Sequence, residues 1–479
     1  MSVSESGMLK PTTGNRKRNL SIGSLCLGSM CIGLTVGWPQ SSLSYVILTN
    51  CNDVCYDLST DGSTTVQMIM NFGSCIGALL PSYIADVYGR RFALAFAALL
   101  NFTFWTILAT WQSHLVRLQI ICSAALGGFA TGIYVTTTAL YISEISLPRT
   151  RGTIGALAAF FAYAGAFFGS CLIFITYNRI ISSVMALVAI MFLISVRMWM
   201  VESPYYLFMR GKTLEAKLSL KDLRGARTLL EVDEEFKTIE LFHTEVNESP
   251  KNSRCNLCAL QISSRKRKYA TLGTIFLCIT QMVGAYGMDD YSENFLNEIV
   301  PDYGRIIIAS LDVCSVAVCV CVIEKFGRRQ ILLAISIVGS SVSCLIMGIM
   351  TLTEYGRSAR KEGKLSSSLL PAAILGLYYL VYTLGLTPIL PVLTGEIFPS
   401  RGKTLILGFC ISFIYFCSIA IQAIFETLNE RKGSDLAFAS FAIVGSLGIP
   451  VAFLFVPETR GKTLHEIQNE LGDCTILVS

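Results

Sequence analysis

Two copies of one short motif place a carboxylate and two guanidinium groups close together in the chain. The segments Asp86–Arg91 and Glu324–Arg329 both read acid, two further residues, glycine, arginine, arginine. The glycine permits a tight turn, and arginine binds carboxylates through paired, charge-assisted hydrogen bonds. The motif therefore predicts ion pairs between the ends of neighbouring helices.

Four more acidic residues occur in matched pairs beside prolines. Glu144 and Glu396 are each followed by isoleucine and, within four residues, by proline. Glu202 and Glu458 each lie within two residues of a proline. Together with the two motif acids, these pairs are separated by 238, 252 and 256 residues and occur in the same order. The matched order indicates that the chain is a duplication of one unit.

Ion pairs at equivalent helix ends of two units could hold one side of the molecule shut, as a latch that breaks when that side opens. The alternative is that the basic residues only set membrane orientation. The repetition of the whole motif favours the latch. The candidate latch residues are Asp86, Arg90, Arg91, Glu144, Arg151, Glu202, Glu324, Arg328, Arg329, Glu396, Glu458 and Arg460.

Long apolar segments must position these motifs. Of the 479 residues, 53% are hydrophobic and 15% charged, against about 25% charged in soluble domains. Twelve apolar segments, each long enough to cross a bilayer, are centred near residues 29, 74, 101, 128, 165, 189, 280, 312, 340, 379, 414 and 446. This pattern excludes a soluble globular enzyme. The net charge of +5, with basic residues flanking apolar segments, excludes a nucleic-acid-binding protein.

The predicted fold is an all-α membrane protein whose twelve transmembrane helices form two six-helix parallel repeats. The expected boundaries are an N-terminal tail (1–19), a first half (20–207), a polar linker (208–268), a second half (269–456) and a C-terminal tail (457–479). Within the linker, Leu214 and Leu218 alternate with charged residues, which indicates amphipathic helix.

The distribution of charge predicts the orientation. Most lysines and arginines fall in the tails, the linker and the even-numbered loops, whereas the first loop carries Asp53, Asp57 and Asp61 and no basic residue. By the positive-inside rule both tails and the linker are cytoplasmic. We expect a multi-pass protein of the plasma membrane.

Longer stretches around these motifs resemble the sugar porter family of the major facilitator superfamily. Tyr141–Gly152 is similar to the family signature after the fourth span, and Val456–Leu464 to its C-terminal signature. Gly33–Trp38 and Glu202–Leu207 resemble the arthropod branch of facilitated trehalose and sugar transporters. The resemblance covers nearly the whole chain and implies the major facilitator fold, alternating access, and a monosaccharide or disaccharide substrate.

The resemblance also places the sugar contacts, and many of these positions carry other residues here. A family glutamine of span five falls on Ala159, and a family tryptophan of span ten falls on Pro391. Of two glutamines in span seven only Gln281 is kept. Since each hydrogen bond to a hydroxyl contributes about 0.5–1.5 kcal/mol, we expect a site remodelled away from hexoses. The candidate substrate-binding residues are Ala159, Tyr163, Thr280, Gln281, Tyr286, Asp312, Pro391 and Tyr415.

The sequence thus predicts a facilitative uniporter for a small neutral solute, with a sugar as the first expectation. We see no motif for a nucleophile, metal or nucleotide, so we expect no enzyme activity and no cofactor; the expected partners are the solute and the bilayer. One alternative is a sugar sensor that does not transport. The other is a proton-coupled symporter that uses Asp312, because a carboxylate within a span often marks a pathway.

The cysteines outside the spans leave two questions open. Cys51 and Cys55, in the first loop, could form a disulfide or stay reduced. Cys255 and Cys258 form a CxxC motif in the linker, but a zinc site would need a second pair nearby.

Overall fold

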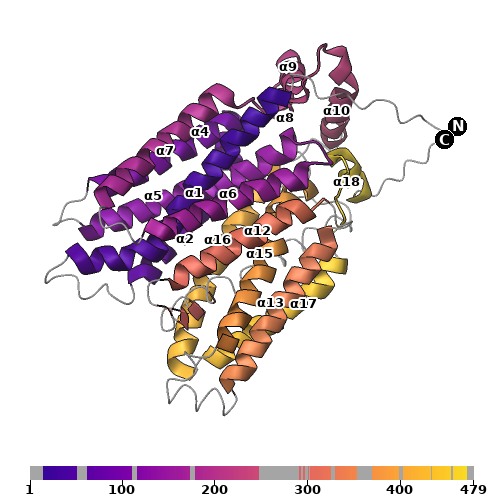
Figure 1. The fold of residues 1–479 in the computed structure, drawn as a ribbon. Coiled ribbons are helices and arrows are strands. Elements are labelled where there is room, and N and C mark those ends of the chain that lie inside the picture. Colours follow the sequence, from indigo (N-terminus) through magenta and orange to yellow (C-terminus); the bar gives the residue numbers. More distant parts are fainter. Residues whose placement is uncertain are drawn as a thin grey trace.

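The computed structural model describes residues 15–50, 62–110, 116–172, 178–247, 288, 291–292, 295–296, 300, 303–324, 329–352, 369–398, 403–432, 434–454 and 457–471. These residues form helices and turns, with no β-strand among them (Figure 1). The predicted span near residue 280 lies outside the described residues, as do Cys51, Cys55, Cys255 and Cys258.

Helices of the first half account for all six predicted spans there. They are α1 (Asn15–Asn50), α2 (Gly62–Leu79) with α3 (Pro81–Val87), α4 (Arg90–Ala109), α5 (Val116–Ile145), α6 (Arg151–Cys171) and α7 (Asn178–Trp199). The second span is bent by 40° between α2 and α3. Pro81, the first residue of α3, explains the bend, because it has no N–H to continue the hydrogen bonds of α2 and its ring crowds the carbonyl of Gly77.

The polar linker and the second half follow. Helix α8 (Pro204–Met209) crosses the expected start of the linker at residue 208, and the linker continues with α9 (Thr213–Arg224), a 3₁₀ turn (Leu230–Val232) and α10 (Asp233–Asn247). The second half contains α12 (Gly304–Val322), α13 (Arg329–Leu352), α15 (Leu369–Ile397), α16 (Lys403–Lys432), α17 (Ser434–Leu454) and the short α18 (Leu464–Leu471). Among the described residues, ten helices are long and apolar enough to span a membrane, or eleven if the bent pair is one span.

The two halves repeat one packing plan. In the first half α4 packs against α5 and α7, and α2 packs against α5. In the second half α13 packs against α15 and α17, and α12 packs against α15. Counted within its own half, each contact joins spans of the same number: three with four, three with six, and two with four. The helix packing therefore shows the duplication that the repeated motifs indicate.

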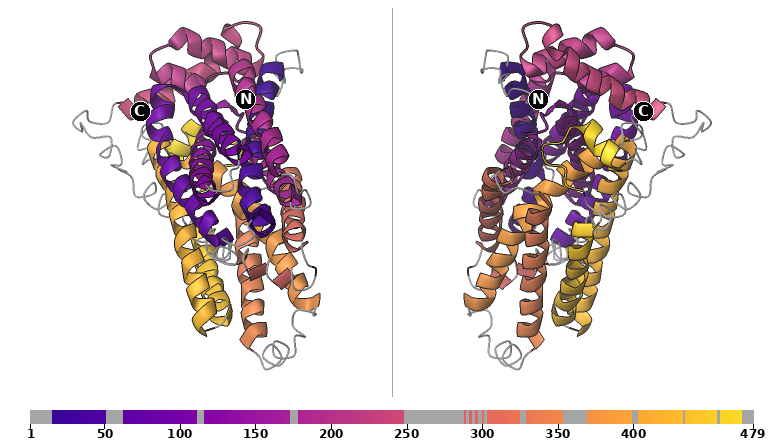
Figure 2. Two further views of the ribbon diagram at one scale, coloured as in Figure 1. Left: turned by 90° about the vertical axis from the view of Figure 1, so that its left-hand side faces the viewer. Right: turned by 90° about the vertical axis from the view of Figure 1, so that its right-hand side faces the viewer.

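The halves meet along two helix pairs and around α15. Helix α2 packs against α16, α6 packs against α12, and α15 also contacts α5 and α6. The linker helices α8, α9 and α10 lie with α18 at one end of the bundle (Figures 1 and 2). Lys17 of α1 donates to Asp222 of α9 at 2.7 Å, so α1 begins at this same end. We call it the linker end.

Apolar side chains cover the outside of the bundle. On α7, Leu187, Met191 and Met198 are exposed and lie on one helix face. A stripe of this kind on a helix whose opposite face is packed suits contact with lipid. The outer surface thus supports the expected membrane environment.

Candidate substrate cavity and contacts between the halves

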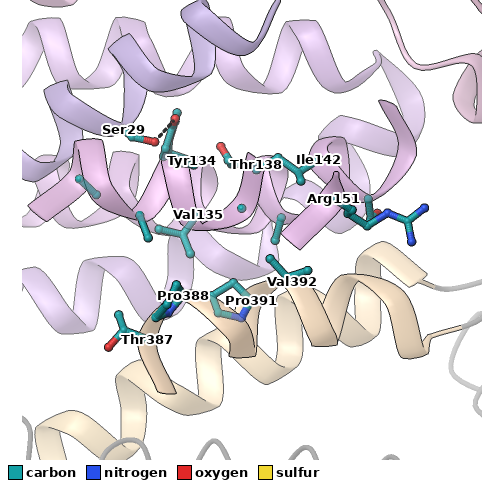
Figure 3. A pocket seen from close by; sticks show the side chains of 16 residues that line it. Ser29, Tyr134, Val135, Thr138, Ile142, Arg151, Thr387, Pro388, Pro391 and Val392 are labelled. Atoms are coloured by element: carbon teal, nitrogen blue, oxygen red, sulfur yellow. Dashed lines mark hydrogen bonds between the residues drawn. The ribbon is translucent and has the colours of Figure 1, made fainter. Parts of the chain in front are cut away.

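A cavity lies between the two halves, walled by α1, α5 and α6 on one side and α15 on the other (Figure 3). Its empty space is about 610 Å³, which includes open solvent at its mouth. The lining residues are Ser29, Tyr134, Val135, Thr138, Ala139, Ile142, Ser143, Arg151, Gly155, Ala158, Ala159, Ala162, Thr387, Pro388, Pro391 and Val392.

Two of the predicted substrate-binding residues, Ala159 and Pro391, line this cavity, and so does Arg151 of the predicted latch. Asp312 and Tyr163 are half-buried on α12 and α6 but are not among the lining residues. Tyr415 packs instead against an apolar cluster to which α2, α3, α4, α5 and α16 contribute. Thr280, Gln281 and Tyr286 lie outside the described residues.

Sequence reasoning missed the hydroxyl groups of the cavity. Ser29 and Tyr134 are 2.9 Å apart, and the Tyr134 hydroxyl donates to the Leu25 carbonyl at 2.6 Å. Thr138 lies one helical turn after Tyr134 on α5, and Thr387 lies on α15. The spacing of Tyr134 and Thr138 on one helix face is the signal that could have indicated them.

Prolines shape the α15 wall. Pro388 and Pro391 lie inside the helix and face the cavity. Because proline has no N–H, the carbonyl of Thr387 receives no helical hydrogen bond from position 391. The wall therefore combines the apolar rings of two prolines with the Thr387 side chain.

The cavity is closed toward the linker end by contacts that cross between the halves. Arg151 of α6 donates to Glu396 of α15 at 3.2 Å, and both side chains are buried, with exposures of 3% and 1%. Lys403 Nζ donates to Ser143 Oγ at 2.7 Å, and Thr404 donates to Asp86 at 2.8 Å. Sequence analysis missed Lys403. An arginine–glycine pair precedes it at Arg401 and Gly402, as at Arg151 and Gly152 in the first half.

Other predicted latch residues make contacts within one half. Arg90 of α4 donates to both oxygens of Glu144 of α5, at 3.0 and 2.8 Å, and also to Asp86 at 3.4 Å. The side chains of Arg90 and Glu144 are 2% and 4% exposed. This pair fastens α4 to α5 and does not reach the second half.

Glu202 binds the start of α4. Its carboxylate accepts from the backbone N–H groups of Arg90 at 2.9 Å and Arg91 at 3.3 Å. Unsatisfied N–H groups and the helix dipole make a helix N-terminus a favourable place for a carboxylate. Burial nevertheless raises the pKa of the Glu202 carboxyl, since the charged form is removed from water.

Glu458 occupies the equivalent place in the second half. It accepts from the backbone N–H of Gln330, in the first turn of α13, at 3.4 Å. Arg460 lies 3.7 Å from Glu324 and also donates to the Glu324 carbonyl. Arg328 lies outside the described residues, and of Arg329 the structure gives only its place in α13. Of the candidate latch residues that the structure describes, Arg151, Glu396 and Asp86 make contacts that cross between the halves.

Gly89 lies directly before α4, beside the Glu202 carboxylate, in a backbone conformation that favours glycine. Its φ is +101°, a region that non-glycine residues rarely adopt, and an added Cβ would lie 2.6 Å from Glu202 Oε2. We expect Gly89→Ala to lower the melting temperature of the purified protein clearly more than Gly211→Ala. Gly211 has φ +75° and nothing within 4 Å of its added Cβ, so it isolates backbone strain from displacement of Glu202. Equal losses would show that the Glu202 contact contributes little.

Comparisons with known proteins agree with this architecture. Residues 21–471 match the family model described as "Sugar (and other) transporter". The facilitated trehalose transporter Tret1 of Culex quinquefasciatus is 24% identical over 462 residues, covering 94% of this chain and 84% of that protein. Trehalose transporter 1 of Drosophila melanogaster is also 24% identical over 94% of this chain, which spans 51% of that longer protein.

Solved structures show the same fold. The proton:xylose symporter XylE bound to 6-bromo-6-deoxy-D-glucose superposes with a TM-score of 0.77 at 18% identity, covering 95% of this chain and all of that chain. The inward open conformation of the xylose transporter XylE from E. coli gives 0.63 at 18% identity, over 93% of this chain and 99% of the other.

Proposed function

The chain belongs to the sugar (and other) transporter family, and from that premise we propose that it is a facilitative uniporter for a small neutral solute. The observation that carries the proposal is the buried Arg151–Glu396 pair, which joins the two halves beside an interhalf cavity. A cavity closed on one side by breakable contacts is what alternating access requires.

The two halves act as rigid bodies in this mechanism. Arg90–Glu144 and the Glu202 contacts hold the helices of the first half together, and Glu458 and Arg460 do so in the second. Opening toward the linker end then breaks few interactions, chiefly those of Arg151, Lys403 and Thr404. The solute would be released on that side.

The solute is neutral because the cavity offers no uncompensated charge among its described walls. Arg151 is the charged residue there, and its guanidinium binds Glu396 and points away from the cavity (Figure 3). The relatives are described as trehalose transporters, so a monosaccharide or disaccharide is the first class to test.

Proton coupling is the second candidate, since XylE is described as a proton:xylose symporter. Against it, α1 contains no Asp or Glu, and Asp312 is not among the lining residues. Uniport therefore needs no assumption about how a proton would reach the cavity.

We propose further that the linker end faces the cytoplasm and that the protein resides in the plasma membrane. The linker helices carry many basic residues, including Lys212, Lys217, Lys221 and Arg224, which favours the cytoplasmic side. The boundaries at residues 20, 208, 269 and 457 then separate tails, halves and linker.

Uptake by the purified full chain in proteoliposomes tests this function. We expect saturable uptake of labelled neutral sugars that stops at equal concentrations, with the same rate with and without a pH gradient. Asp312→Asn should leave this pH independence unchanged. Accumulation driven by an inward proton gradient and lost in Asp312→Asn would establish symport instead. Saturable binding without uptake would point to a sensor.

A further inference from the structure

The cavity walls formed by described residues present little that can bind a hydroxyl group. None of the sixteen described lining residues carries a carboxamide, a carboxylate or an indole. Ala158, Ala159 and Ala162 of α6 and Pro388 and Pro391 of α15 line the cavity. A polyhydroxylated ligand needs donors and acceptors close to each hydroxyl, and alanine and proline side chains supply none.

Most of the described hydroxyl groups that line the cavity already donate to an acceptor within the protein. The Tyr134 O–H goes to the Leu25 carbonyl, so the Ser29 O–H donates to the Tyr134 oxygen. The Ser143 hydroxyl donates to the Leu140 carbonyl and accepts from Lys403. Three of the five lining hydroxyls therefore have no proton left to donate to a ligand.

Two hydroxyls remain. The Oγ1 atoms of Thr138 and Thr387 are buried without a close hydrogen-bond partner among the described residues, and the Thr138 hydroxyl lies near enough to the Tyr134 hydroxyl to interact with it. The Thr387 carbonyl lacks the donor that a residue other than proline would supply at position 391. The described walls can therefore bind one or two hydroxyls of a solute and otherwise present hydrocarbon to it.

We propose that the transported solute is a neutral, sugar-sized ring with an apolar face and few hydroxyls, such as a deoxygenated sugar, in preference to a fully hydroxylated hexose or disaccharide. The proposal rests on the proposed transport function and names its substrate class. A buried hydroxyl without a partner weakens binding by about one to two orders of magnitude. An apolar ring face gains from contact with alanine, valine and proline.

Ala159 is the residue that we expect to set this preference, because it lies in the middle of the α6 wall. Ala159→Gln adds a carboxamide that can bind two neighbouring hydroxyls. The matched control is Ala164→Gln on the same helix, since Ala164 is not a lining residue. Only the first variant should change the ranking of sugars.

The test is calorimetric binding of D-glucose, trehalose and a dideoxyglucose to the full chain in a sugar-free detergent. We expect the dideoxyglucose to bind at least about tenfold more tightly than glucose, and Ala159→Gln, but not Ala164→Gln, to reduce this ratio. Equal or tighter binding of glucose or trehalose by the unmodified chain overturns the proposal, and so does binding of none of the three.

Flux of the same three sugars in proteoliposomes separates this inference from the proposed function. Uptake that favours glucose or trehalose would refute the substrate class and leave the transporter intact. Dideoxyglucose binding in the expected order without any uptake would support the class of ligand and refute transport.

Discussion

Replacing Glu396 by glutamine will open the linker end. Arg151 is 3% exposed and its guanidinium binds Glu396 across the two halves, so the variant leaves a buried cation without a carboxylate. Removing one partner of a buried pair costs about 3–5 kcal/mol. This cost is relieved when the halves separate and water reaches Arg151. The ratio of closed to open molecules should therefore fall by about two to four orders of magnitude.

Hydrogen exchange of the full chain in nanodiscs measures this shift. We expect faster exchange in peptides that cover the starts of α6 and α16, together with slower sugar uptake. Glu235→Gln is the matched control, because Glu235 binds Arg224 at 2.7 Å between two linker helices. It should leave exchange at α6 and α16 as it was. Unchanged exchange in Glu396→Gln would mean that the pair does not hold the halves together.

A disulfide across the linker end will stop transport. A Cβ built on Gly395 of α15 would lie 3.3 Å from the Cβ of Ser143 on α5, close to the separation of about 3.5–4.5 Å in disulfides. Oxidation of the Ser143→Cys/Gly395→Cys double variant should therefore tie the two halves shut beside the cavity. We expect uptake to be abolished, ligand binding to persist, and a reducing agent to restore uptake.

The single variants under the same oxidant are the controls, since the chain already has 17 cysteines. Cleavage within the linker shows whether the new bond has formed, because cross-linked halves then migrate together on a gel. Full uptake by molecules shown to be cross-linked would contradict opening at this end.

The sequence predicted the helices well because their signal is strong. Apolar segments long enough to cross a bilayer, with acidic residues repeated beside prolines at their ends, allow few ways to divide the chain into helices. The same residues could not tell which carboxylate meets which arginine. Glu144 could have paired with Arg151, seven residues on, but helix packing turns it toward Arg90 and leaves Arg151 for Glu396.

The cavity residues were harder to predict. Hydroxyl residues in membrane helices often bond their own backbone, as Thr131 does to the Gly127 carbonyl and Thr137 to the Ile133 carbonyl. A threonine in the sequence therefore does not reveal whether it faces a ligand. Only the packing of α5 against α1 and α6 places Thr138 beside the cavity while Thr131 and Thr137 stay within the first half.

The division between contacts within a half and contacts across the halves also predicts how inherited or laboratory variants would present. A change at Arg90 or Glu144 damages a half in every conformation, so a cell would lose the protein to quality control. A change at Glu396 or Lys403 leaves each half intact, so normal amounts of the protein would reach the membrane. The transport rate of each molecule would be altered. Measurements of the amount of protein in the membrane and of its transport rate would together sort the residues of the repeated motif into these two groups.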